Sequence, residues 1–234
     1  MHALAYWITG PGVYLAVGVF ALGLGYRLYQ WRRMAASPMR LGIFPKPPPG
    51  AKVLRIVADT LAFPQLAEVN PSLWVAAIVF HVALLGVFVG HLHLLGRFPG
   101  QLEEMMTANA SLVGGTMGVL WALAALYLLI RRFKTPYKEI STPEDYLLLL
   151  LILGAVVMGD HLRFFGHVDV GVYQEYIRSL YAFRPELPAA LATSSVKWSF
   201  VVHILLANLL LIYLPFSKLV HFIGAFFTNG IRRG

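Results

Sequence analysis

The chain contains no cysteine among its 234 residues. This absence excludes disulfide bonds, iron–sulfur clusters held by this chain, and the Cys-x-x-Cys-His motif that attaches a c-type haem covalently. Charged residues are also scarce, at 13% of the sequence, and no polybasic stretch for binding nucleic acid is evident. Any haem must therefore be held without a covalent link, and any iron–sulfur cluster must belong to another polypeptide.

Hydrophobic residues make up 58% of the chain and form long runs. Runs of about 18 or more apolar residues predict transmembrane helices. Five qualify, at about 6–30, 73–96, 109–131, 144–165 and 198–226. The remaining residues are too few for a soluble core. We therefore predict an all-α integral membrane bundle of five helices that forms a single membrane domain over residues 1–234. The first run lacks a signal-peptide pattern, so we expect it to be retained.

Lysine and arginine are distributed unevenly between the two expected membrane sides. The side reached after the first helix holds fourteen of the 19 Lys and Arg residues, and the other side holds five. Because Lys- and Arg-rich loops stay in the cytoplasm, we predict an outer N-terminus and a cytoplasmic C-terminus. The net charge of +8 is then the excess on the inner face, and needs no nucleic acid to explain it.

The proline-rich segment 37–72 is expected on the cytoplasmic side. Within it, residues 52–61 place their apolar side chains on one broad helical face and their charges elsewhere. This pattern is typical of a helix in the membrane interface. The segment is either a linker resting on lipid or a docking platform for a soluble subunit. The outer segment 168–196, with several tyrosines, is expected to form a short amphipathic cap.

Four histidines of the second and fifth apolar runs are candidate ligands. His81 and His91 are ten residues apart, and His203 and His221 are eighteen residues apart. Ionisable residues in lipid are costly and indicate function by default. Four histidines on two helices are enough for two bis-histidine haems. The antiparallel arrangement pairs His81 with His221 near the cytoplasm, and His91 with His203 near the exterior.

The two spacings correspond to helical rises of roughly 15 Å and 27 Å. A kink at Pro215, between the last two histidines, would help to reconcile them. We therefore predict that the fifth helix is not straight. Below, His91 and His203 are called the outer pair, and His81 and His221 the inner pair.

Two glycines, Gly86 and Gly90, lie on the same expected helix as His81 and His91. They either form a small-residue contact with another helix or leave room for a flat porphyrin. His93 is expected at the interface and not as a ligand. Asp160 and His161, at the outer end of the fourth helix, are either a solvated edge or groups that exchange protons.

The motif Phe80-His81 with Gly86-Val-Phe-Val-Gly90-His91, the His203 to His221 spacing, and Leu214-Pro215-Phe216-Ser217 resemble the membrane cytochrome b family of the respiratory nitrate reductase gamma subunit. The resemblance spans all five helices. It implies two b haems. It also implies that electrons pass between a quinone (menaquinone or ubiquinone) and an iron–sulfur subunit on the cytoplasmic face. It also implies a multi-pass protein of the prokaryotic inner membrane that reacts with quinone but is not a complete enzyme alone.

Within this resemblance, the quinone site would lie beside the outer pair, with Asp160 and His161 as candidate proton-exchange groups. The sequence also departs from the nitrate reductase subunit. The first loop is longer and richer in proline, and Met106 lies near the position of a lysine in that family. A longer loop is similar to relatives in sulphur-metabolising complexes with a heterodisulfide-reductase-like partner. The alternatives are a membrane anchor, and a transporter whose histidines relay protons without a redox role.

Overall fold

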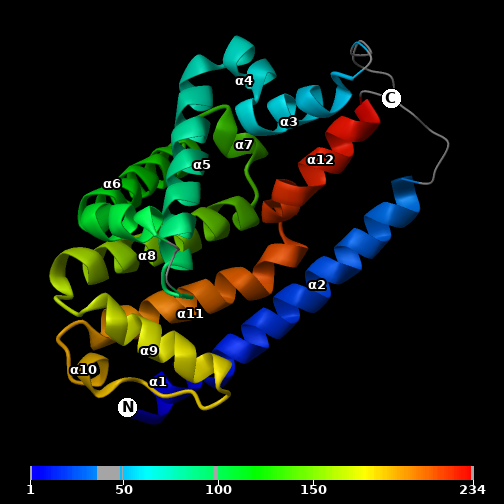
Figure 1. The fold of residues 1–234 in the computed structure, drawn as a ribbon. Helices are drawn as coiled ribbons and strands as arrows, with labels where there is room; N and C mark the ends of the chain where they lie inside the picture. The colour runs from blue at the N-terminus through cyan, green and yellow to red at the C-terminus, as the bar shows by residue number, and fades with distance from the viewer. Residues whose placement is uncertain (1, 36–47, 49, 97–99, 233–234) are drawn as a thin grey trace. The chain divides into compact units, whose positions relative to one another are not determined.

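The computed structural model describes residues 2–35, 48, 50–96 and 100–232, and the regular elements among them are all helical (Figure 1). This confirms the predicted all-α class. The α-helices are α1 (His2–Thr9), α2 (Pro11–Ala35), α3 (Lys52–Ala62), α4 (Pro64–Val69), α5 (Pro71–Leu92), α6 (Gln101–Arg131), α7 (Tyr137–Ile140), α8 (Pro143–Phe165), α9 (Val170–Tyr181), α10 (Ala189–Ala192), α11 (Lys197–Tyr213) and α12 (His221–Arg232). The 3-10 turns η1 (Leu214–Phe216) and η2 (Lys218–Val220) connect α11 to α12.

Five helical segments of the described chain are long and apolar enough to cross a membrane, as predicted. The protein itself covers little of their surface: in the most apolar part of α5, only 11% of the residues are buried. Such a surface is stable in lipid and costly in water. The five segments are Ala3–Arg33, Pro71–Leu92, Gly114–Arg131, Pro143–Phe165 and Lys197–Phe216. Which membrane side holds each terminus stays a prediction.

Two helices have bounds that differ from the expected ones. Helix α6 begins at Gln101 and not near 109, because Gly100 adopts a positive φ of 57° before a run of good helix formers. Helix α5 ends at Leu92 and not near 96. There the backbone changes to i→i−3 hydrogen bonds, such as Leu94 N to His91 O at 3.0 Å.

The chain breaks at Pro215, and this confirms the prediction that the fifth helix is not straight. Helix α11 ends at Tyr213, and α12 begins only at His221. Proline lacks the N–H that would continue the helix, and its ring clashes with the preceding turn. Ser217 then adopts an extended conformation, and its hydroxyl accepts a hydrogen bond from Leu219 N at 3.1 Å.

The chain divides into two compact units, and the boundaries fall within α2 and α5. Unit 1 comprises Met1–Ala16 and Val79–Leu210, and unit 2 comprises Val17–Ile78 and Leu211–Gly234. This division concerns packing, and the single membrane domain over 1–234 stays a prediction.

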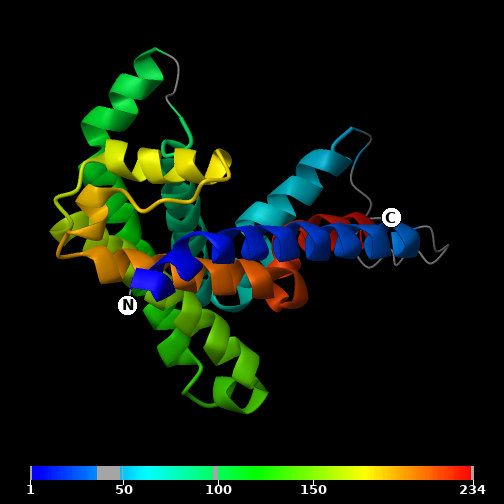
Figure 2. The same ribbon diagram turned by 90° about the horizontal axis from the view of Figure 1, so that it is seen from below.

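In unit 1, α6 packs along α8. The predicted cap is α9, which packs on α11 (Figure 2): Tyr176 of α9, Leu191 and Phe200 form a buried cluster. The Tyr176 hydroxyl donates to Thr9 O at 2.6 Å, which joins the cap to α1.

In unit 2, α3 packs against α12. Asn229 Nδ2 donates to Thr60 Oγ1 at 3.0 Å, and Trp74 Nε1 donates to Ala62 O at 2.7 Å. Helix α3 coincides with the interfacial helix predicted over 52–61, and its side chains Val53 and Leu54 are 73% and 71% exposed. The part of segment 37–72 that precedes α3, including Lys46, lies largely outside the described residues.

Candidate haem site

The outer pair of histidines is brought together in unit 1. His91 lies near the end of α5 and His203 in the first half of α11. Their imidazole rings are nearly parallel, with an interplanar angle of 12° and ring centres 6.2 Å apart. A metal midway between them would lie 3.1 Å from each ring centre, half of that distance. This matches a metal–nitrogen bond of about 2.0–2.1 Å plus about 1 Å from that nitrogen to the ring centre.

The second ring nitrogen of each histidine is fixed by a backbone carbonyl. His91 Nδ1 donates to Val87 O at 2.8 Å, and His203 Nδ1 donates to Ala155 O at 2.8 Å. Because a carbonyl can only accept, each Nδ1 carries the hydrogen and each Nε2 has a lone pair for a metal. Hydrogen bonds of this kind orient the ligand ring and increase its basicity.

Helix α8 forms the wall behind His203. A Cβ on Gly159 would lie 3.2 Å from His203 Cε1 and 3.5 Å from its Nδ1. The ring therefore packs directly on the α8 backbone, one turn from the carbonyl of Ala155 that accepts its hydrogen bond. Sequence reasoning had assigned no ligand to this helix and missed this support.

The two glycines of α5 have different surroundings. A Cβ on Gly86 would lie 2.9 Å from Met117 Cγ, so Gly86 permits close contact between α5 and α6. At Gly90, no atom of the described residues lies within 4 Å of the Cβ position. The helix-contact hypothesis therefore describes Gly86, and the open space beside Gly90 suits a bulky group next to His91.

Among the described residues, no three or more His, Asp or Glu side chains are placed to hold a metal ion together. Two imidazoles alone cannot complete the tetrahedral or octahedral shell of an ordinary protein metal site. They suffice for an iron whose other four ligands come from a porphyrin. The outer pair therefore fits a bis-histidine haem better than a bare ion.

The two histidines of the inner pair belong to different units. His81 lies within α5, with its ring edge against Phe80 at 5.4 Å between centres. His221 is the first residue of α12, and its Nδ1 donates to Lys218 O at 2.9 Å. Because a carbonyl can only accept, Nδ1 of His221 carries the hydrogen, as in the outer pair. The pairing of His81 with His221 stays a prediction.

Asp160 and His161 leave α8 in different directions, since neighbouring residues are about 100° apart around a helix. The Asp160 carboxylate packs onto Gly118 of α6, where any Cβ would collide with it. His161 packs on Phe165, and its buried Nδ1 has no hydrogen-bond partner among the described residues. Of these two side chains, the structure therefore places only that of Asp160 between α6 and α8. Asp160 directly follows Gly159, which packs against His203.

The remaining histidines of this end lie elsewhere. His167 is exposed and follows the end of α8 with a positive φ of 42°. His93 lies beyond the end of α5, and its backbone carbonyl accepts a hydrogen bond from Gln174 Nε2 at 3.0 Å.

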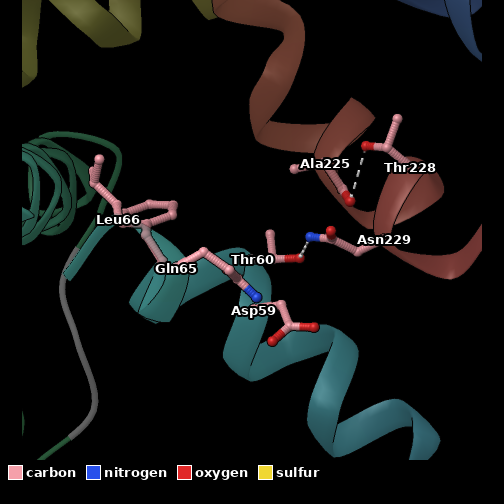
Figure 3. Close-up of a pocket in the computed structure, with 8 residues that line it drawn as sticks. Asp59, Thr60, Gln65, Leu66, Ala225, Thr228 and Asn229 are labelled. Atoms are coloured by element: carbon pink, nitrogen blue, oxygen red, sulfur yellow. Dashed lines mark hydrogen bonds between the residues drawn. The ribbon is translucent and has the colours of Figure 1, made fainter. Parts of the chain in front are cut away.

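Unit 2 contains a cavity of about 350 Å³ between α3, α4 and α12 (Figure 3). Two of its polar side chains, Thr60 and Asn229, point toward one another and are hydrogen-bonded. Thr228 Oγ1 donates to Gly224 O at 2.8 Å. The Thr60–Asn229 hydrogen bond connects α3 to α12, whereas that of Thr228 lies within α12. The lining residues are Asp59, Thr60, Phe63, Gln65, Leu66, Ala225, Thr228 and Asn229.

Comparison of the sequence with known proteins identifies the family of the chain. The model of the nitrate reductase gamma subunit matches residues 64–230, which include all four histidines of the two pairs. The chain belongs to the nitrate reductase gamma subunit family. Membership confirms the resemblance seen in the sequence.

Relatives of this family member come from archaea and bacteria. An Hdr-like menaquinol oxidoreductase cytochrome b-like subunit of Archaeoglobus fulgidus is 28% identical, over 92% of this chain and 76% of the relative. Its counterpart in Archaeoglobus profundus is 23% identical, over 92% and 75%. The respiratory nitrate reductase 1 gamma chain of Escherichia coli is 28% identical, over 62% and 69%. The similarity to these relatives and the five apolar helices together indicate that the chain is a multi-pass membrane protein related to subunits of larger complexes.

Proposed function

We propose that this protein is a dihaem cytochrome b subunit that passes electrons between a membrane quinone pool and an iron–sulfur partner on the cytoplasmic face. The observation that carries the proposal is the outer pair, whose near-parallel rings are spaced for one iron between them. When bound, each haem supplies an iron that takes up and releases a single electron. Relatives named as menaquinol oxidoreductase subunits favour menaquinone over ubiquinone.

The residues of this chain have distinct tasks at the outer haem. His91 and His203 supply the axial nitrogens, and the carbonyls of Val87 and Ala155 keep their rings from turning. Gly90 leaves space beside His91, and Gly159 lets α8 approach His203. Because the ligand rings are held in place, little rearrangement accompanies a change in the charge of the iron.

At the inner haem, His81 and His221 would supply the axial nitrogens. The hydrogen bond from His221 to Lys218 O prepares its Nε2 for this role. We place this haem toward the cytoplasm and the iron–sulfur partner on the same side. The support is the fourteen-to-five bias of Lys and Arg. The resemblance to the nitrate reductase gamma subunit, and relatives in archaea and bacteria, favour the inner membrane of a prokaryotic cell as its location.

The quinone would bind beside the outer haem, where its protons can reach water. Asp160 lies next to the residue that supports His203 and has a carboxylate enclosed against Gly118, so we assign it the first proton-exchange step. His161, partly buried on a different face of α8, would pass the proton on.

The haem assignment is tested by absorption spectra and the haem-to-protein ratio of purified protein. We expect two b haems in the wild type and one in His203→Ala. His93→Ala and His167→Ala are matched controls, since each removes an imidazole from the same end of the helices, and both should keep two haems. Absence of b-type bands from the wild type, or loss of a haem in either control, would contradict the assignment.

The quinone assignment is tested by the rate of haem reduction after addition of a menaquinol analogue. We expect slower reduction, with both haems retained, in Asp160→Asn, His161→Gln and Gly118→Ala. In Gly118→Ala, the new methyl group displaces the carboxylate. The control is Gly114→Ala, whose methyl would meet Arg163 at an ordinary 3.8 Å. Wild-type rates in Asp160→Asn and Gly118→Ala together would move the site to the inner haem.

A further inference from the structure

Two hydrogen-bond donors without acceptors lie at the end of unit 1 where α8 ends and α11 begins. The Tyr173 hydroxyl of α9 is buried and has no hydrogen-bond partner among the described residues. The Arg163 guanidinium of α8 likewise has no hydrogen bond or ion pair among them. The lack of an acceptor is costly for the buried Tyr173 hydroxyl, whereas Arg163 is exposed. Neither group has a part in the electron and proton path described above.

Arg163 lies one helical turn beyond the residue that supports His203. Gly159 and Arg163 are four residues apart, so they share a face of α8 and are about 6 Å apart along its axis. The guanidinium lies flat on α6, with Nη2, Cζ and Nε at 3.8, 3.9 and 3.9 Å from the Cβ position of Gly114. This stacking fixes its plane and leaves the N–H edges for an acceptor.

Tyr173 reaches the same place from the cap. Its ring packs on Phe200, at 5.9 Å between centres, and Phe200 precedes His203 by about one turn of α11. Its hydroxyl oxygen lies 3.5 Å from the Cβ position of Gly166, at the end of α8. Burial raises the pKa of Tyr173, and the positive charge of Arg163 partly opposes this, so the two side chains are close enough to interact.

We propose that Arg163 and Tyr173 bind the propionate carboxylates of the haem held between His91 and His203. This inference rests on the proposed function. Haem b carries two carboxylates on one edge of its flat ring. Inside a membrane protein these anions need donors as partners. An arginine fork can hold one carboxylate with two parallel hydrogen bonds, and the phenol supplies a further one. Both donors lie on the same side of His203, so they can hold one edge of the haem and fix its rotation about the His91–His203 axis.

The test is the midpoint potential of the outer haem, measured by optical redox titration of purified protein. The positive charge of Arg163 favours the reduced haem. Two unit charges about 12 Å apart, at an effective dielectric constant of about 20, interact strongly enough that loss of the arginine charge should lower the ratio of reduced to oxidised haem about tenfold. We therefore expect Arg163→Gln to lower the potential by about 59 mV, the tenfold equivalent for one electron. Tyr173→Phe should cause a smaller shift in the same direction.

A second measurement separates contact with the propionates from a general charge effect. In resonance Raman spectra of the reduced protein, we expect the propionate bending modes to shift in Arg163→Gln and Tyr173→Phe. Arg163→Lys keeps the charge but loses the planar fork, so it should largely restore the potential and not the mode. Arg178→Gln and Tyr181→Phe are matched controls on exposed parts of α9 and should change neither signal.

Two results would overturn the inference while leaving the proposed function intact. One is a bound bis-histidine haem with unchanged potential and Raman modes in both Arg163→Gln and Tyr173→Phe. The other is loss of co-purifying phospholipid phosphorus in Arg163→Gln with unchanged propionate modes, which would assign the site to a lipid phosphate. Absence of haem from the wild-type protein would instead refute the proposed function.

Discussion

Gly159 offers the sharpest test of how α8 supports the proposed outer haem. Alanine in place of glycine in a helix is favourable by about 0.8–1.0 kcal/mol. At this position, however, the new Cβ would lie 3.2 Å from His203 Cε1. Carbon contacts are most favourable at about 3.5–4.0 Å. The ring must therefore move by a few tenths of an ångström, away from the carbonyl of Ala155 that it now contacts at 2.8 Å.

The expected result is opposite changes in two measured quantities. Resistance to thermal unfolding should be unchanged or higher in Gly159→Ala, because the helix gains propensity. Haem affinity should fall, because loss of a hydrogen bond that orients a ligand typically costs 10–100-fold in metal affinity. Gly159→Val, with two more methyl groups, should lose most of the outer haem.

The assay is the rate of haem transfer to an excess of an apo-haem-protein acceptor. Measured in a His221→Ala background, which on the proposed assignment should lack the inner haem, it reports on the outer haem alone. Gly154→Ala is the matched control: it gains the same propensity on α8, but its Cβ would meet a movable methyl group, Leu206 Cδ1, at 3.1 Å. Equal haem transfer rates in Gly159→Ala and Gly154→Ala would refute the reasoning.

Two further predictions concern stability in unit 1. Asp145 is 7% exposed, pairs with Arg132 at 3.4 Å and caps α8; Asp145→Asn should therefore cost about 1–2 kcal/mol in denaturant unfolding, whereas the exposed control Glu139→Gln should not. Burial raises the pKa of Tyr176 above its unfolded value of about 10, so its contribution to stability is complete below pH 10 and is lost as the pH rises toward the folded pKa. Tyr176→Phe should abolish this alkaline loss of stability in pH-dependent unfolding, and cost about 1–3 kcal/mol at neutral pH because the Thr9 carbonyl loses its donor.

The sequence was sufficient for the features that depend on composition and spacing. Apolar runs predicted the five spans, and Pro215 predicted the break in the fifth helix. The segregation of apolar and charged residues onto different helical faces predicted α3. The spacing of the histidines, together with antiparallel helices, predicted that His91 meets His203. Each of these predictions depends on the types of side chain and their spacing, and both can be read directly from the sequence.

Features that depend on backbone groups could not be predicted in this way. The acceptor for His203 is the carbonyl of Ala155, and any residue other than Ala would offer the same atom. In the sequence Gly118 is one of several small residues of α6, yet among the described glycines it is the one that packs against the Asp160 carboxylate. Such contacts depend on the rotation of α8 against its neighbours, which hydropathy does not determine.

The hydrogen bond that Arg27 Nε donates to Pro215 O, at 3.0 Å, has a consequence for the synthesis of this chain. The two residues are 188 positions apart. At about 5–20 residues per second, the acceptor is made roughly 9–38 s after the arginine. During that interval Arg27, within the first span, must extend its charged end toward the headgroups. A nascent chain that stops at Tyr213 never acquires this acceptor, so the break in the last helix supplies a hydrogen-bond partner for a charge in the first span.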